Sequence, residues 1–157
     1  MSTLEWQEAR HALSAGAMDR AHKEFVDLTN QLAEADPASE EKRLALLLAH
    51  CEDHFAQEQE WMLRSRLPGA DNHLRDHDGV VALLRSTLAE LRAGKRGVGR
   101  EVADSLATWF DHHAATMDAA LALHMQQTAP KTQTGIPAVG GRGRPRPRKP
   151  GVVRSHA

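Results

Sequence analysis

The chain has 157 residues, of which 41% are apolar and 26% charged, which is ordinary for a globular protein with one core. No apolar run reaches the roughly 20 residues of a membrane-spanning helix, and the first residues lack the basic-then-apolar order of a signal peptide. We therefore expect a cytoplasmic protein. The single cysteine, Cys51, allows no intramolecular disulfide and is expected to be a buried, inert thiol.

The net charge of −1 hides a division along the chain. Residues 131–157 contain seven basic and no acidic residues, so they carry +7 and leave −8 on the first 130 residues. Five of the seven prolines lie at or after Pro130. Such a composition cannot build a core. The sequence predicts a folded domain over residues 1–128 and a disordered basic tail over residues 129–157.

Apolar residues recur at helical spacing in the first half of the folded part. The first predicted helix covers about residues 17–35 and ends before a proline. The second begins at Ser39, which can act as an N-cap, and runs to about residue 66. Glu40 and Glu41 in its first turn suit the positive end of the helix dipole.

Two further helices follow in the second half. The third is predicted to begin with Asp71 as its cap and to end at the glycine-containing turn at 94–99. The fourth covers about residues 100–125, and no strand pattern competes with these segments. Short connections favour an all-α, up-down-up-down four-helix bundle, an architecture in which facing helices build metal sites in the core.

Histidines and carboxylates recur on these helices at spacings that suit metal binding. Residues four apart lie on one face of a helix. Among the candidate ligands, His54 with Glu58 and His73 with His77 have this spacing. His113 and Asp118 are five apart, roughly 140° around an ideal α-helix, so periodicity does not select them. Imidazole suits zinc, copper or iron, and a buried polar group without a partner would cost about 1 to 3 kcal/mol.

The sequence segments around these residues resemble those of a known family. They are Asp19-Arg-Ala-His22-Lys, His54-Phe-Ala-Gln-Glu58-Gln-Glu-Trp-Met62, His73-Leu-Arg-Asp-His77 and Trp109-Phe-Asp-His-His113-Ala-Ala-Thr-Met-Asp118. Together they closely resemble the hemerythrin family, and bacteriohemerythrins in particular. The resemblance runs from Trp6 to about Met125.

This resemblance implies two non-haem iron ions and a division of their ligands. One iron would be held by His73, His77 and His113, the other by His22 and His54, with Glu58 and Asp118 bridging them beside an oxo or hydroxo group. The iron with two histidines keeps an open position for O2. The resemblance therefore implies reversible O2 binding for storage, delivery or sensing, by a protein that is not an enzyme and has no catalytic residues.

Two other functions stay open at this point. The same ligands could serve a di-iron oxidase, a peroxidase or an enzyme that handles nitric oxide. Against this, ferritin-like di-iron sites use four Glu and two His, whereas mostly neutral ligands disfavour the high oxidation states of oxygenase chemistry. The other rival is a DNA-associated sensor of O2 or redox state.

Apolar residues near the ligands are candidate walls of an O2 pocket, although any bundle core needs such residues. They are Phe25, Phe55, Met62, Trp109 and Phe110. Ala114 stands where the family commonly has isoleucine, which predicts a looser pocket. His50, one turn before His54, is either an outer partner of the site or an interior polar residue. His112 is expected to face solvent.

The segment Gly141-Arg-Gly-Arg-Pro-Arg-Pro-Arg148 resembles an AT-hook, in which such a core lies in the narrow minor groove of A·T-rich DNA. The possible nucleic-acid contacts are Arg142, Arg144, Arg146, Arg148 and Lys149. The alternative is a solubilising tail, or one that binds anions without specificity. The expected partners are therefore O2 and possible nucleic acid, with no membrane, and we expect a monomer.

Overall fold

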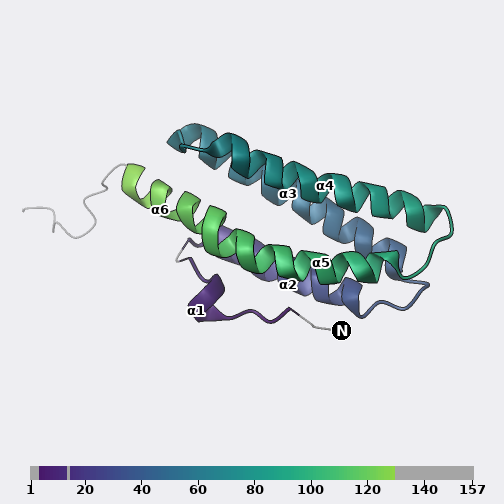
Figure 1. The fold of residues 1–157 in the computed structure, drawn as a ribbon. Coiled ribbons are helices and arrows are strands. Elements are labelled where there is room, and N and C mark those ends of the chain that lie inside the picture. Colours follow the sequence, from purple (N-terminus) through teal and green to yellow (C-terminus); the bar gives the residue numbers. More distant parts are fainter. Residues whose placement is uncertain (1–3, 14, 130–157) are drawn as a thin grey trace, which may run out of the picture.

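The computed structural model describes residues 4–13 and 15–129, in which four long helices form an antiparallel bundle (Figure 1). The first three are α2 (Ala17–Ala33), α3 (Glu40–Ser65) and α4 (Ala70–Arg92). The fourth consists of α5 (Val98–His113), the π-helical turn η1 (Ala114–Asp118) and α6 (Ala119–Thr128), which follow one another directly. A short helix, α1 (Glu8–His11), precedes them.

The helices pack in a closed ring. Helix α2 contacts α3 and α5, and α4 contacts the same two helices. The described residues contain no strand. The predicted all-α, up-down-up-down bundle is confirmed. Among these helices, none has the length and apolar character needed to cross a membrane.

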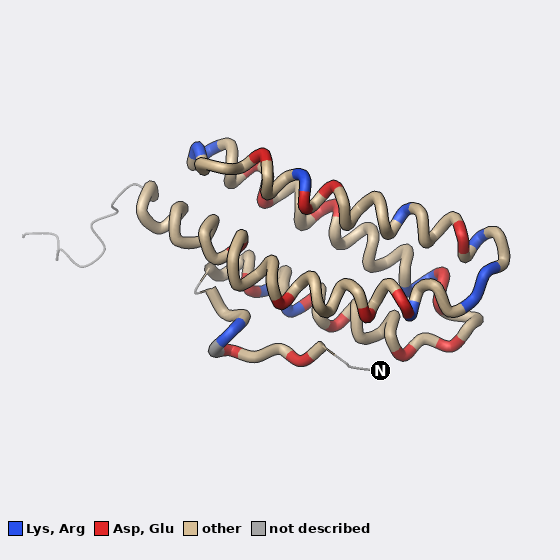
Figure 2. The backbone as a smooth tube through the Cα atoms, in the orientation of Figure 1, with Lys and Arg blue, Asp and Glu red and all other residues tan. Residues whose placement is uncertain are grey.

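The basic tail lies outside the described residues. This holds for Arg142, Arg144, Arg146, Arg148 and Lys149 of the AT-hook-like segment. The division between a domain and a tail therefore stays a prediction, as do the nucleic-acid contacts. Over the described part, acidic and basic positions are scattered among the helices, and α6 has neither, as Figure 2 shows.

Of the two predicted helix caps, the first is confirmed as the N-cap residue and the second is not. Ser39 is the N-cap residue of α3, but its side chain makes no capping hydrogen bond. Helix α4 begins after Gly69, which adopts φ 76°, in the left-handed region that favours glycine. Asp71 lies in the first turn of α4, so its predicted role as the cap was wrong.

Glu40 connects two helices that start at the same end of the bundle. Its side chain is only 1% exposed. Its Oε1 accepts a hydrogen bond from the backbone N–H of Gly97 at 2.9 Å, and its Oε2 accepts from Gly99 at 2.9 Å and Arg100 at 3.1 Å. A carboxylate of α3 thus satisfies donors that the start of α5 leaves free.

The core has two apolar parts with polar residues between them. The larger part contains Phe25, Phe55 and Phe110, and the smaller contains Met18, Met62, Leu121 and Ala122. On each long helix, buried histidines and carboxylates lie between members of the two parts. The bundle therefore has a buried polar layer, closed by apolar side chains above and below it.

Candidate metal centre

Seven buried side chains from four helices meet in this polar layer. They are His22 of α2, His54 and Glu58 of α3, His73 and His77 of α4, His113 of α5 and Asp118 of η1. None is more than 7% exposed. The structure thus brings together all seven residues that the sequence singled out as candidate metal ligands.

The two carboxylates divide the five histidines into two groups. Glu58 Oε2 lies 2.5 Å from His54 Nε2 and 3.6 Å from His22 Nε2. Its other oxygen, Oε1, lies 3.3 Å from Nε2 of both His73 and His77. One oxygen therefore faces His22 and His54, and the other faces two of the remaining three histidines.

Asp118 repeats this division. Its Oδ2 lies 3.0 Å from His22 Nε2, while its Oδ1 lies 3.0 Å from His73 Nε2 and 3.1 Å from His113 Nε2. Ligand atoms within 4.8 Å of one another accordingly form two overlapping groups. One group contains three histidines and both carboxylates, and the other contains two histidines and Glu58. Both carboxylates have the orientation needed to bridge two cations.

The facing atoms are close together yet poorly satisfied by one another. Five of them are buried without a hydrogen bond of acceptable geometry, namely Nε2 of His22 and His73, both oxygens of Glu58 and Oδ1 of Asp118. In addition, the Nε2 atoms of His77 and His113 face each other at 3.0 Å. Buried polar atoms without partners are rare and costly. Nitrogen and oxygen atoms in this arrangement fit cations of the iron or zinc type.

The pKa values of the cluster residues also indicate that positive charge is favoured in its centre. Burial tends to lower the pKa of His22, but the adjacent carboxylates of Asp118 and Glu58 outweigh burial and raise it to about 9. The pKa of His73 is likewise raised to about 9. Burial tends to raise the pKa of Asp118, but the histidines lower it to about 2. The carboxylates are thus ionised, and bound cations can replace the histidine protons as their counter-charge.

The π-helical turn explains how His113 and Asp118 share a site. The N–H of Ala119 bonds to the carbonyl of Ala114, five residues earlier. One turn of a π-helix therefore takes more residues than a turn of α-helix. As a result, a residue five positions after His113 returns to the same side of the helix. The α-helical angle of roughly 140° does not apply here.

A small cavity adjoins the two-histidine side of the cluster. Its volume is about 10 Å³, and it is lined by His22, His54, Asp118 and four aromatic residues, Phe25, Phe55, Trp109 and Phe110. This volume is close to the minimum that holds one water molecule. None of the three histidines on the other side of the cluster lines it.

Two other candidate wall residues lie elsewhere. Met62 lies one helical turn beyond Glu58 and packs with Met18 in the smaller apolar part. Ala114 is fully buried in the larger part and does not line the cavity. The predicted loosening of the pocket by the small Ala114 side chain is therefore not seen in this cavity, which Ala114 does not line.

Sequence reasoning missed a carboxylate that supports the cluster from outside. Asp76 Oδ2 accepts a hydrogen bond from His113 Nδ1 at 2.6 Å and another from Trp109 Nε1 at 3.0 Å. The indole of Trp109 also stacks on the His113 ring, with centroids 4.3 Å apart and 21° between the planes. Asp76 directly precedes His77 in the sequence, and nothing in that position indicates that it contacts a different helix.

The remaining histidines have structural contacts. His50 stacks parallel to His54, with centroids 5.8 Å apart, and its Nε2 donates to the Ala21 carbonyl at 3.0 Å. It therefore supports a ligand as well as the packing of α2 on α3. His112 is exposed, as expected. Cys51 is fully buried, and burial raises the pKa of its thiol to about 12.

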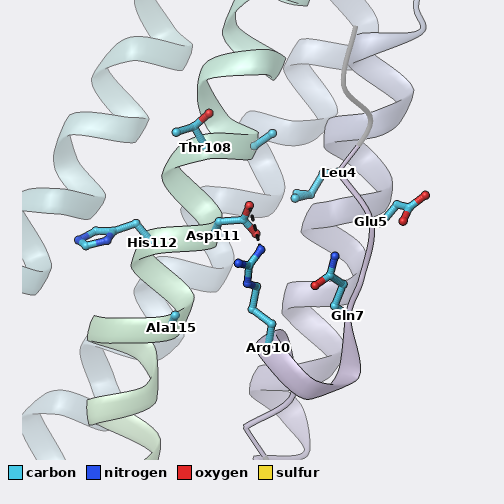
Figure 3. Close-up of a pocket in the computed structure, with 9 residues that line it drawn as sticks. Leu4, Glu5, Gln7, Arg10, Thr108, Asp111, His112 and Ala115 are labelled. Carbon is cyan, nitrogen blue, oxygen red and sulfur yellow. Dashed lines mark ion pairs between the residues drawn. The ribbon is translucent and has the colours of Figure 1, made fainter.

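The N-terminal segment packs against α5 outside the cluster. His11 is buried, with Nε2 2.8 Å from Asp111 Oδ1, and its ring contacts Phe110 with centroids 5.1 Å apart. Arg10 pairs with the same aspartate at 3.8 Å, as Figure 3 shows. A groove of about 550 Å³ lies here, between residues such as Gln7 and α5. It contains none of the seven cluster residues.

Comparison with known proteins agrees with this geometry. Residues 14–122 match the model of the hemerythrin HHE cation binding domain. A bacteriohemerythrin from Ralstonia nicotianae is 34% identical over 130 residues, which cover 83% of this chain and 94% of that protein. The crystal structure of a wild-type hemerythrin has a TM-score of 0.73 at 21% identity, covering 79% of this chain and 98% of that one.

A crystal structure of a mutant hemerythrin also has a TM-score of 0.73, at 22% identity, and covers 80% of this chain. At these identities the solved structures establish the fold, and the domain match and the bacteriohemerythrin establish the family. This chain belongs to the hemerythrin family.

Proposed function

We propose that this protein binds O2 reversibly at a non-haem di-iron centre held by the seven residues of the cluster. His73, His77 and His113 would hold one iron, and His22 and His54 the other, with Glu58 and Asp118 bridging them. The main support is the division of the histidines by the two oxygens of each carboxylate. When bound there, two ferrous ions would supply the electrons that O2 needs to bind.

The cavity supports the two-histidine side as the place where O2 binds. It touches His22 and His54 but none of the other three histidines. With two histidines and two bridging carboxylates, that side also offers fewer protein ligands, as an open position requires. The aromatic walls exclude water and its protons, which strengthens electrostatic interactions in the site and limits side reactions.

A binding protein fits the cluster better than an enzyme does. The hemerythrin relatives are oxygen-binding proteins rather than enzymes. Five neutral imidazoles and two carboxylates compensate less positive charge than the four-glutamate ligand set of ferritin-like di-iron enzymes. The part that this binding plays in the cell, whether storage, delivery or sensing, and the expected cytoplasmic location stay predictions.

Oxygen uptake by the iron-loaded protein tests the proposal. The reduced protein, equilibrated with stepped O2 pressures, should take up O2 to saturation and release it under argon. His54→Gln should abolish this uptake, whereas His112→Gln, an exposed histidine beside a ligand, should leave it unchanged. Continuous O2 consumption in the presence of excess ascorbate would instead favour the oxidase alternative.

A further inference from the structure

The Nδ1 atoms of the cluster histidines, which face away from the centre of the cluster, have different surroundings. In the described structure, Nδ1 of His22 and Nδ1 of His77 are buried without a hydrogen-bond partner. His113 Nδ1, in contrast, lies 2.6 Å from the Asp76 carboxylate. Helix α4 thus supplies two ligands to the cluster and also a carboxylate that holds a ligand of α5.

The contact with Asp76 determines which nitrogen of His113 carries the proton. A carboxylate only accepts hydrogen bonds, so the proton lies on Nδ1 and the lone pair of Nε2 is free. That Nε2 faces the cluster, 3.1 Å from Asp118 Oδ1 and 3.0 Å from His77 Nε2. The tautomer that Asp76 selects is therefore the one that can bind a metal.

Trp109 holds the same arrangement from a second direction. Its indole stacks on the His113 ring, and its Nε1–H donates to the same Asp76 oxygen that His113 contacts. The ring plane of His113 and the position of the carboxylate are therefore fixed together. In this three-residue contact of Asp76, Trp109 and His113, the His113 side chain is 1% exposed and the Asp76 side chain is 35% exposed.

We propose that Asp76 is a positioning residue for the metal centre, which fixes the tautomer and orientation of His113 and thereby sets metal affinity and the reduction potential. This inference rests on the proposed di-iron function for the potential, but its metal-affinity part needs only that the cluster binds a divalent cation. A carboxylate that accepts a hydrogen bond from the non-ligating nitrogen of a metal-binding histidine increases the basicity of that histidine. Loss of such a carboxylate typically lowers metal affinity 10- to 100-fold.

Substituting Asp76 with asparagine disturbs the hydrogen bond to His113 with little change in side-chain size. The asparagine amide group can donate to Nδ1, which favours the tautomer that carries its proton on Nε2 and cannot bind a metal. An analogous substitution in the serine-protease triad acts through the wrong tautomer. Asp76→Glu keeps the charge and should restore part of the effect, since its longer side chain can still reach His113.

Cobalt(II) titration of the seven-ligand cluster tests the affinity directly. We expect Asp76→Asn to bind cobalt 10- to 100-fold more weakly than the wild type, and Asp76→Glu to lie between them. Asp78→Asn is the matched control, because Asp78 is exposed on the same helix, and it should match the wild type. Denaturant unfolding of the metal-free variants separates this effect from a general loss of stability.

The reduction potential of the iron-loaded protein provides a second readout. Loss of the negatively charged partner makes His113 a weaker donor, so the ferric state is less favoured and the potential of Asp76→Asn should rise. Cobalt affinity and potential equal to those of Asp78→Asn would overturn the proposal. If the wild type binds two cobalt ions but its iron form does not bind O2, the proposed function fails while the affinity difference still tests the role of Asp76.

Discussion

Removing the charge of Glu40 tests whether this buried carboxylate holds the start of α5 in place. The change is Glu40→Gln, which preserves size and shape. The wild-type side chain accepts three backbone N–H groups, of Gly97, Gly99 and Arg100, and is 1% exposed. A Cβ on Gly99 would lie 2.8 Å from Glu40 Cγ, so the two residues fit closely and leave little room for rearrangement.

The size of the effect follows from the three hydrogen bonds. A glutamine can place its oxygen at the Oε2 position and keep the bonds to Gly99 and Arg100, each weakened by about 1 kcal/mol because the acceptor is neutral. Its amide NH2 group then faces the backbone N–H of Gly97. Two donors face each other there, which costs about 1 to 3 kcal/mol more. We expect the free energy of unfolding to fall by about 3 to 5 kcal/mol.

Urea unfolding of the iron-loaded protein, followed by circular dichroism, measures this loss. Glu41→Gln is the matched control, because Glu41 is half exposed and makes only a 3.3 Å ion pair with Arg92. An exposed pair contributes at most about 1 kcal/mol. If Glu40→Gln destabilises the protein no more than Glu41→Gln does, the three bonds do not hold α5, and the reasoning is refuted.

Four further changes test other parts of the structure. His77→Ala should lower iron content below two per chain and reduce Tm, because bound metal stabilises the folded state; full iron content with an unchanged Tm would contradict the ligand assignment. At pH 7 the metal-free protein holds protons on His22 and His73, whose pKa values are about 9, so metal loading should release about two protons from these rings and fewer above pH 9, as a pH indicator would show. Ala114→Ile adds bulk at a fully buried position and should lower the free energy of unfolding by about 1 to 3 kcal/mol; an unchanged urea midpoint would reveal space there. The full-length chain should bind DNA with a slope of log affinity against log salt concentration of roughly −4 to −5. Deleting residues 131–157 removes seven basic residues and should abolish this binding. A full-length chain that does not bind A·T-rich duplex would refute the AT-hook interpretation.

Much of the site could be predicted because its ligands follow helical periodicity. The pairs His54 with Glu58 and His73 with His77 are each four residues apart, so spacing alone places each pair on one face. Asp118 is different, because the π-helical turn changes the angle between it and His113. Nothing in the local sequence indicates that turn, and only the resemblance to the hemerythrin family identified Asp118.

The supporting residues could not be predicted, because their partners come from other helices. Asp76 contacts a histidine 37 positions later, and His11 contacts an aspartate 100 positions later. Glu40 was interpreted through the dipole of its own helix, whereas its side chain binds the start of α5. Each of these roles depends on the packing of two elements, which single-sequence periodicity does not specify.

Iron content and optical spectra, measured together on one sample, test the di-iron assignment most directly. We expect two irons per chain and a visible absorption band that appears when the reduced protein meets air and disappears under argon. The seven converging side chains provide ligands for both ions. One iron or none per chain in fully loaded protein, or a band that air produces and argon does not reverse, would contradict a reversible di-iron oxygen binder.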